Sequence, residues 1–532
     1  MKRINFNLKY TIILLLALAF LVCAMLGLTH IANNFEQVGQ HYTENFNANV
    51  NRQFSSIVML FMMGLIILLP ERKRIGTTQT LLLSFIVGLL TFEFISALLL
   101  IFHIYYSLLS VLVVYFVYVV LLYVFMLKKD KDALAIKNKD VTKIVFWVIL
   151  SLALGYALSK VPINILSFDS IEYKNLGQIF VKEHYIAQYA LYQMSGHAFI
   201  PTLLNSIAAM FNFGYAYAIQ NMFLVTSLLL FGYVLFDETR KRGIGEKKAF
   251  VFALIGFLVL ATSFFVIFLG VCLLPNIFAG FFMLFLMYYM YKYIRDKDTI
   301  NLALSFIFMV AFCFTRVEGP LVAVFIVAYF AHKNIKAKQM LKYTWGVFAT
   351  LALWYTSFFL HVGGNFDSAF LTVGKTALIT GLFLVLGAYI YLKDKFFSKI
   401  NDKLFTLFIV AVIVFTIGIN ILDISKFNIN LKTMFQNMFY EGFWFTAWFG
   451  IIILSIGAMI LTKKKNTFLE GIIPIFLILL FAIFAFRETT LHINWSDSGN
   501  RMLMHIYPLI IFVLADNIIS YFTADKKKKI KK

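Results

Sequence analysis

The sequence predicts an all-α protein that crosses a membrane many times. Of its 532 residues, 61% are apolar, 18% are aromatic and only 14% are charged. Apolar stretches recur from Tyr10 to Phe522 with short polar interruptions, whereas a soluble chain of this length divides into domains with polar surfaces. The recurring stretches therefore predict a polytopic helical membrane protein.

The apolar stretches predict about sixteen spans in strict alternation across the bilayer. The first stretch follows Met1-Lys2-Arg3 but is long for a signal peptide, so we interpret it as a retained span. Several stretches, among them 274–291, 299–315 and 318–331, are shorter than the roughly 20 residues that cross a bilayer perpendicularly. The expected spans are 10–31, 55–70, 78–102, 106–127, 143–161, 213–236, 249–272, 274–291, 299–315, 318–331, 343–360, 376–392, 404–422, 442–462, 468–486 and 501–522.

The chain has a net charge of +21, and its Lys and Arg residues are distributed according to this alternation. Most of the Lys and Arg residues fall in alternate loops, together with both chain ends, and the positive-inside rule assigns these loops to the cytoplasm. We therefore expect a multi-pass protein of the cell membrane with both termini cytoplasmic. Membrane topology accounts for the basic residues, so we expect no nucleic-acid partner.

Loop lengths predict three regions. Residues 1–142 hold four spans and form an accessory region, residues 143–522 form the core, and residues 523–532 form a basic cytoplasmic tail. The long outer segment 162–200 includes a mixed apolar and polar stretch, and we expect a helix on the outer membrane surface near 179–192.

An acidic pair in this outer segment is the first candidate site. Asp169 and Glu172 lie three residues apart, so on a helix they share a face and can bind one substrate group or one metal ion. The alternative is that both carboxylates belong to a solvated loop.

Further polar residues gather at other outer span ends. Arg316 and Glu318 interrupt an apolar region, where they either bind a ligand or form a local ion pair. Arg501 and His505 lie four apart, so a regular helix directs both to one face. Arg501 can instead extend to the lipid headgroups, and His505 can satisfy a neighbouring helix.

The remaining ionisable residues give weaker signals. Glu93 lies inside the third span, where it either bonds to a neighbouring helix or couples to protonation. Cys23, Cys272 and Cys313 all lie in or at apolar segments and are interpreted as packing residues, with no disulfide or cysteine metal site.

The order of these motifs along residues 143–522 resembles the GT-C superfamily of membrane glycosyltransferases and is similar to glycosyltransferase family 39 and mannosyltransferase-like proteins. Members use polyprenyl-phosphate sugars as donors and carry an essential Asp in the first large outer loop, which corresponds here to Asp169. The resemblance implies a GT-C-like transmembrane core. The motifs that carry it are Asp169 with Tyr173, His197-Ala198-Phe199-Ile200-Pro201, Phe213-Gly214, Thr315-Arg316-Val317-Glu318-Gly319 and Arg501-Met502-Leu503-Met504-His505-Ile506-Tyr507-Pro508.

This resemblance implies sugar transfer, with inversion, to a cell-envelope glycan, lipid or protein on the non-cytoplasmic face. Asp169 is the expected general base, and Glu172 orients the acceptor or shares a divalent cation such as Mg²⁺ or Mn²⁺, although two carboxylates alone do not complete a metal site. The other expected roles are donor-phosphate binding by Arg316, Arg501 and His505, and substrate contact by Tyr173, Glu318, His492 and Asp497.

Two other classes fit the same sequence. A transporter or lipid-linked sugar flippase also has many spans and intramembrane charge, although no paired halves with matching Gly or Pro breaks are evident. A polysaccharide polymerase or ligase shares lipid-linked donors and an outer active site.

Overall fold

A computed structural model describes residues 50–129, 138–160, 167–186, 199–316, 318–333, 336–362, 373–393, 396, 401–444, 447–461, 467–485, 487 and 489–529. The predicted all-α class is confirmed, since this part of the chain consists of helices and their connections and contains no β-strand.

The helix bounds are as follows. The first group is α2 (Val50–Leu68), η2 (Leu69–Glu71), α3 (Arg72–Ile75), α4 (Thr77–Ile101), α5 (Leu108–Lys129), α6 (Asn138–Lys160), α7 (Phe168–Glu183) and α9 (Phe199–Met210). The second is α10 (Tyr217–Lys241), α11 (Glu246–Ala261), α12 (Phe264–Val271), α13 (Asn276–Asp296), α14 (Thr299–Thr315), α15 (Gly319–His332), α16 (Ala337–Val362) and α17 (Val373–Lys393). The third is α18 (Asn401–Leu422), α19 (Ile424–Gln436), η3 (Asn437–Glu441), α20 (Ala447–Leu461), α21 (Thr467–Glu470), α22 (Ile472–Ala485), α23 (Ser498–Met502), η4 (Leu503–His505) and α24 (Tyr507–Lys529).

The chain is a polytopic helical membrane protein. Among the described residues, 10 helices are long and apolar enough to cross a membrane, or 11 when the bent pair α11 and α12 counts as one span. Each expected span from 55–70 onward overlaps one to three of the helices, whereas the expected span 10–31 lies outside the described residues. The total is below the expected sixteen partly because α14, α15 and the apolar part of α20 are shorter helices.

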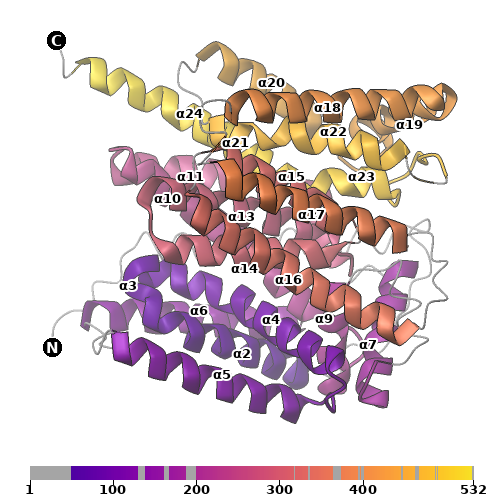
Figure 1. Cartoon of the computed structure of the whole chain (residues 1–532). Coiled ribbons are helices and arrows are strands. Elements are labelled where there is room, and N and C mark those ends of the chain that lie inside the picture. Colours follow the sequence, from indigo (N-terminus) through magenta and orange to yellow (C-terminus); the bar gives the residue numbers. More distant parts are fainter. Residues whose placement is uncertain are drawn as a thin grey trace.

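The helices lie roughly along one direction in a broad bundle (Figure 1). Helices α2, α4, α5 and α6 form one side, α18, α20 and α22 form the other, and α10, α13 and α14 lie between them. Helices α7 and α23 lie at one end of the bundle, whereas α3 and the C-terminal end of α24 lie at the opposite end.

Two glycines allow α2 and α4 to pack with their backbones in contact. A Cβ atom on Gly64 would lie 1.8 Å from the carbonyl oxygen of Ser84, and one on Gly88 would lie 1.7 Å from that of Leu60. Small residues at a crossing point bring transmembrane helices together because van der Waals contact replaces the hydrophobic driving force that lipid removes. The α2/α4 contact therefore depends on both glycines.

We expect Gly88→Ala to destabilise the protein by about 2 kcal/mol, because the added methyl group meets backbone atoms that cannot rotate away. Thermal unfolding of the purified protein in detergent measures the change. Gly381→Ala on α17 is the matched control, since nothing lies within 4 Å of a Cβ atom there. Equal unfolding midpoints for the two variants would contradict the close α2/α4 contact.

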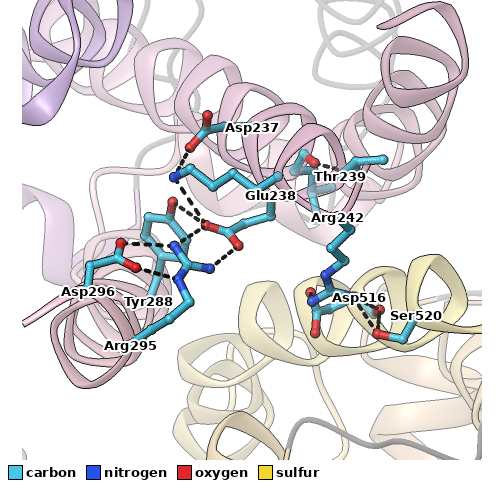
Figure 2. Close-up of polar contacts among 11 residues, drawn as sticks. Asp237, Glu238, Thr239, Arg242, Tyr288, Arg295, Asp296, Asp516 and Ser520 are labelled. Carbon is cyan, nitrogen blue, oxygen red and sulfur yellow. Dashed lines mark hydrogen bonds and ion pairs between the residues drawn. The ribbon is translucent and has the colours of Figure 1, made fainter. Parts of the chain in front are cut away.

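Ion pairs join three helices at the end of the bundle that carries α3 (Figure 2). Glu238 on α10 accepts two hydrogen bonds from Arg295 on α13, at 2.5 and 3.1 Å, and the Tyr288 hydroxyl donates a third at 3.3 Å. Arg242 pairs with Asp516 on α24, which ties that helix to the same end of α10. These contacts tie α10 to both α13 and α24 at this end of the bundle.

The structure differs from two local expectations. The helix expected near 179–192 is found only for residues 179–183, at the end of α7, which begins at Phe168 and ends at Glu183; residues 184–186 are not helical and residues 187–198 lie outside the described part. Helix α19 was not expected, although its apolar residues follow the helical period. The division at residue 142 stays a prediction.

Candidate functional site

The segment that carries the acidic pair is helical. Ser167 caps α7 by accepting a hydrogen bond from the Ser170 backbone N–H, and the Ser170 hydroxyl accepts one from the Ser167 N–H in return. This capping box fixes the first turn. Asp169 lies in that turn, beside the backbone N–H groups of the helix N-terminus.

Helix α7 is held by packing along its length. Gly177 faces α9 so closely that a Cβ atom would lie 2.7 Å from the backbone nitrogen of Ser206. At the C-terminal end of α7, His184 accepts a backbone hydrogen bond from Tyr106, and its ring contacts the Tyr105 hydroxyl at 2.9 Å. Because Tyr105 and Tyr106 follow α4, the N-terminal helices help to position α7.

Asp169 forms an ion pair with Arg501. The Nη1 atom of Arg501 donates to Oδ2 of Asp169 at 2.9 Å, although the two residues are 332 positions apart in the sequence. Arg501 belongs to α23, and its side chain is 12% exposed, while that of Asp169 is 34% exposed. The structure thus brings together the expected base and one of the expected phosphate ligands.

Arg316 and Glu318 form the local ion pair that was the alternative to ligand binding. Arg316 ends α14 in an extended conformation, and its Nε and Nη2 atoms donate to the Glu318 carboxylate at 3.1 and 3.0 Å. Burial raises the pKa of the Glu318 carboxyl, but the charge and hydrogen bonds of Arg316 outweigh burial and hold the pKa below its ordinary value. Glu318 is therefore ionised at neutral pH.

Asp497 organises the segment that leads to α23. Its carboxylate caps the helix by accepting from the backbone N–H groups of Gly499 and Asn500, and it also accepts from that of His492. The side chain of Asp497 is buried, whereas His492 is exposed. Asp497 therefore positions Arg501, and only His492 of these two expected substrate contacts faces outward.

The regular helix expected from Arg501 to His505 is interrupted. Leu503–His505 is a 3-10 helix, in which the side chains turn faster than in an α-helix, so residues four apart do not share a face. Consequently the His505 ring contacts Asn276 at 3.1 Å, whereas Arg501 contacts Asp169. His505 thus takes the interhelical alternative, with Phe312 and Phe476 beside its ring.

Tyr173, Glu172 and Cys272 complete the surroundings of the ion pair. Tyr173 is buried on α7, one turn after Asp169, and Glu172 is half-buried beside it. Burial raises the pKa of the Cys272 thiol to about 12, and the charges of Arg501 and Asp169 act on the same thiol. Cys272 therefore stays protonated next to the site.

Residue Arg487 joins the site although the sequence assigned it no role. Its Nη1 atom lies 3.9 Å from the carboxylate of Asp497, which caps α23. Burial and the positive charges of Arg316 and Arg501 lower the pKa of the Arg487 guanidinium below its ordinary value. The only sequence signal for Arg487 was its position just after an outer span end. An arginine that extends to the lipid headgroups has the same position, so this signal could not distinguish the two roles.

Within the described ranges, no group of three or more His, Cys, Asp or Glu side chains is arranged to hold a metal ion. The arrangement that is present can hold an ionised carboxylate next to several guanidinium groups. Comparison of the chain with protein-family models, with curated proteins and with solved structures finds no match.

Proposed function

We propose that the chain is a membrane glycosyltransferase that moves a sugar from a polyprenyl-phosphate donor to a cell-envelope acceptor on the non-cytoplasmic face. The observation that carries this proposal is the Asp169–Arg501 ion pair. The pair supports this proposal because it holds the carboxylate of Asp169, our candidate proton acceptor, against the permanently charged guanidinium of Arg501, our candidate phosphate ligand.

In the proposed reaction, Asp169 acts on the acceptor and Arg501 acts on the donor. Asp169 accepts the proton of the acceptor hydroxyl as its oxygen attacks the anomeric carbon, and the bond from that carbon to the donor phosphate breaks with inversion. The negative charge that develops on the leaving phosphate is stabilised by Arg501, with the Arg316–Glu318 pair nearby. Glu172 and Tyr173 line the acceptor side of Asp169.

A purified sample reconstituted in vesicles tests this function. We expect it to form a glycosidic bond when a polyprenyl-phosphate sugar and an envelope glycan, lipid or protein acceptor are supplied, with release of polyprenyl phosphate. Mass spectrometry of the acceptor measures the added sugar. Movement of the donor across the vesicle membrane without any glycosidic bond made or broken would contradict the enzyme class.

Glu93 supports a second candidate, a proton-coupled transporter. This residue lies within α4, is 1% exposed, and both of its carboxyl oxygens lack a hydrogen-bond partner among the described residues. An ionisable group inside a membrane span is costly and often carries protons in transporters. The same vesicle measurement, performed with a pH gradient, separates the two functions.

A further inference from the structure

Arg487 is a partly buried cation, with a side chain 26% exposed, that has no close counter-ion among the described residues. Its Nη1 atom is inaccessible to solvent and has no hydrogen-bond acceptor among the described residues. The carboxylate that pairs with it most closely is Asp497, at 3.9 Å. Both carboxylate oxygens of Asp497 already accept hydrogen bonds from backbone N–H groups of the 492–500 segment. Asp497 therefore stabilises that segment and forms no hydrogen bond with the Nη1 atom of Arg487.

Arg501 also has a hydrogen-bond donor that no described residue uses. Its Nη1 atom holds Asp169, but its Nε atom is buried and has no partner in the described part of the chain. A guanidinium group carries five N–H donors in a planar fork, so one edge can hold a carboxylate while another binds a second anion. Leaving a buried charged donor unpaired is costly, which favours a ligand at this position.

We propose that Arg487 and the Nε edge of Arg501 form a binding site for a phosphate group, with Asp169 held beside it on the other edge of Arg501. A tetrahedral phosphate presents oxygens in several directions and can therefore meet two guanidinium groups at once. Burial and the charges of Arg316 and Arg501 lower the pKa of Arg487 despite the opposing charges of Asp497 and Glu318, which agrees with an excess of positive charge here.

This site rests on the proposed function and extends it, because it adds Arg487 to Arg316 and Arg501 as a third arginine for the donor phosphate. The Asp169–Arg501 pair stays intact when the phosphate binds. One guanidinium group then contacts both the base and the leaving group, which fixes their separation. The ligand is a phosphate ester or free phosphate. A membrane lipid and the aqueous phase are its two sources.

Direct binding measurements on the purified full-length protein in phosphatidylcholine nanodiscs test this site. Calorimetric titration uses inorganic phosphate in one arm and a polyprenyl phosphate in the other. We expect wild-type protein to bind at least one of them and Arg487→Gln to bind at least about tenfold more weakly, the loss typical of a charged hydrogen bond. Binding in the polyprenyl arm alone identifies the lipid as the source, and binding in both arms identifies the phosphate group as sufficient.

Matched variants make the result specific. Arg240→Gln, the same substitution at an exposed arginine on α10, should leave binding unchanged. Arg501→Lys keeps a cation opposite Asp169 but lacks the Nε edge, and it should bind phosphate about tenfold more weakly. If Arg487→Gln does not fold, Arg487→Lys replaces it and should still weaken binding severalfold.

Three results overturn the site: no binding of either probe to wild type, unchanged binding by the Arg487 variant, or unchanged binding by Arg501→Lys. Because binding is measured without sugar transfer, the two proposals fail separately. Arg487-dependent phosphate binding without any transfer refutes the glycosyltransferase alone, whereas transfer that is unaffected in Arg487→Gln refutes this site alone.

Discussion

Asp169→Asn is expected to reduce sugar transfer by about 10²- to 10⁴-fold, the usual contribution of a general base, while expression and membrane insertion stay unchanged. The asparagine side chain has almost the same shape but cannot accept the proton of the acceptor hydroxyl at neutral pH. Its amide also removes the negative charge that Arg501 binds. Initial rates of transfer by purified protein, compared at equal amounts of folded enzyme, measure the effect.

Glu172→Gln is the matched comparison, because Glu172 is the other expected catalytic carboxylate and lies three residues further along the same helix. We expect it to lose less activity than Asp169→Asn, since Arg501 pairs with Asp169. Full activity of Asp169→Asn would remove Asp169 from the base role. A larger loss in Glu172→Gln would transfer that role to Glu172.

The largest expected effect on stability is that of Glu238→Ala, at about 3 kcal/mol. The Glu238 side chain is only 2% exposed and accepts hydrogen bonds from Arg295 and Tyr288 (Figure 2). Its removal takes this acceptor away from both donors. Arg295 is 31% exposed and keeps its pair with Asp296, so the expected cost lies at the low end of the range for breaking a buried ion pair. The thermal unfolding midpoint in detergent should fall accordingly.

Asp237→Ala at the preceding position is the control. Asp237 pairs with Lys241, whose side chain is 42% exposed, and solvent screens such a pair, so its loss should cost less than about 1 kcal/mol. Equal destabilisation by the two variants would show that the ion pairs at this end of the bundle do not depend on burial in the way the structure indicates.

Much of the helical architecture could be predicted because hydrophobicity acts locally. Each apolar run such as 78–102 or 404–422 predicts a helix without reference to any other part of the chain, and α4 and α18 are found there. The break between α14 and α15 was also visible, since Arg316 and Glu318 interrupt the apolar run and Pro320 follows at the start of α15.

The site was predicted only in part. Asp169 and Arg501 were both identified as candidates, but their contact was not, because no local pattern specifies which residues meet across 332 positions. Arg316 and Glu318 were left between two alternatives, and only the geometry shows their mutual pairing. Arg501 and His505 were expected on one face of a regular helix, but a 3-10 turn changes the rotation per residue, and their side chains contact Asp169 and Asn276 respectively.

The sequence by itself thus determined that the protein is helical, crosses a membrane many times, and carries its unusual polar residues at span ends. These properties follow from the transfer of single segments into lipid, which depends on composition alone. The tertiary structure decided which of those polar residues meet. Arg501 holds Asp169, and Arg487 has no close counter-ion in the described part of the chain, because the packing of α7, α22 and α23 sets distances that no single segment contains.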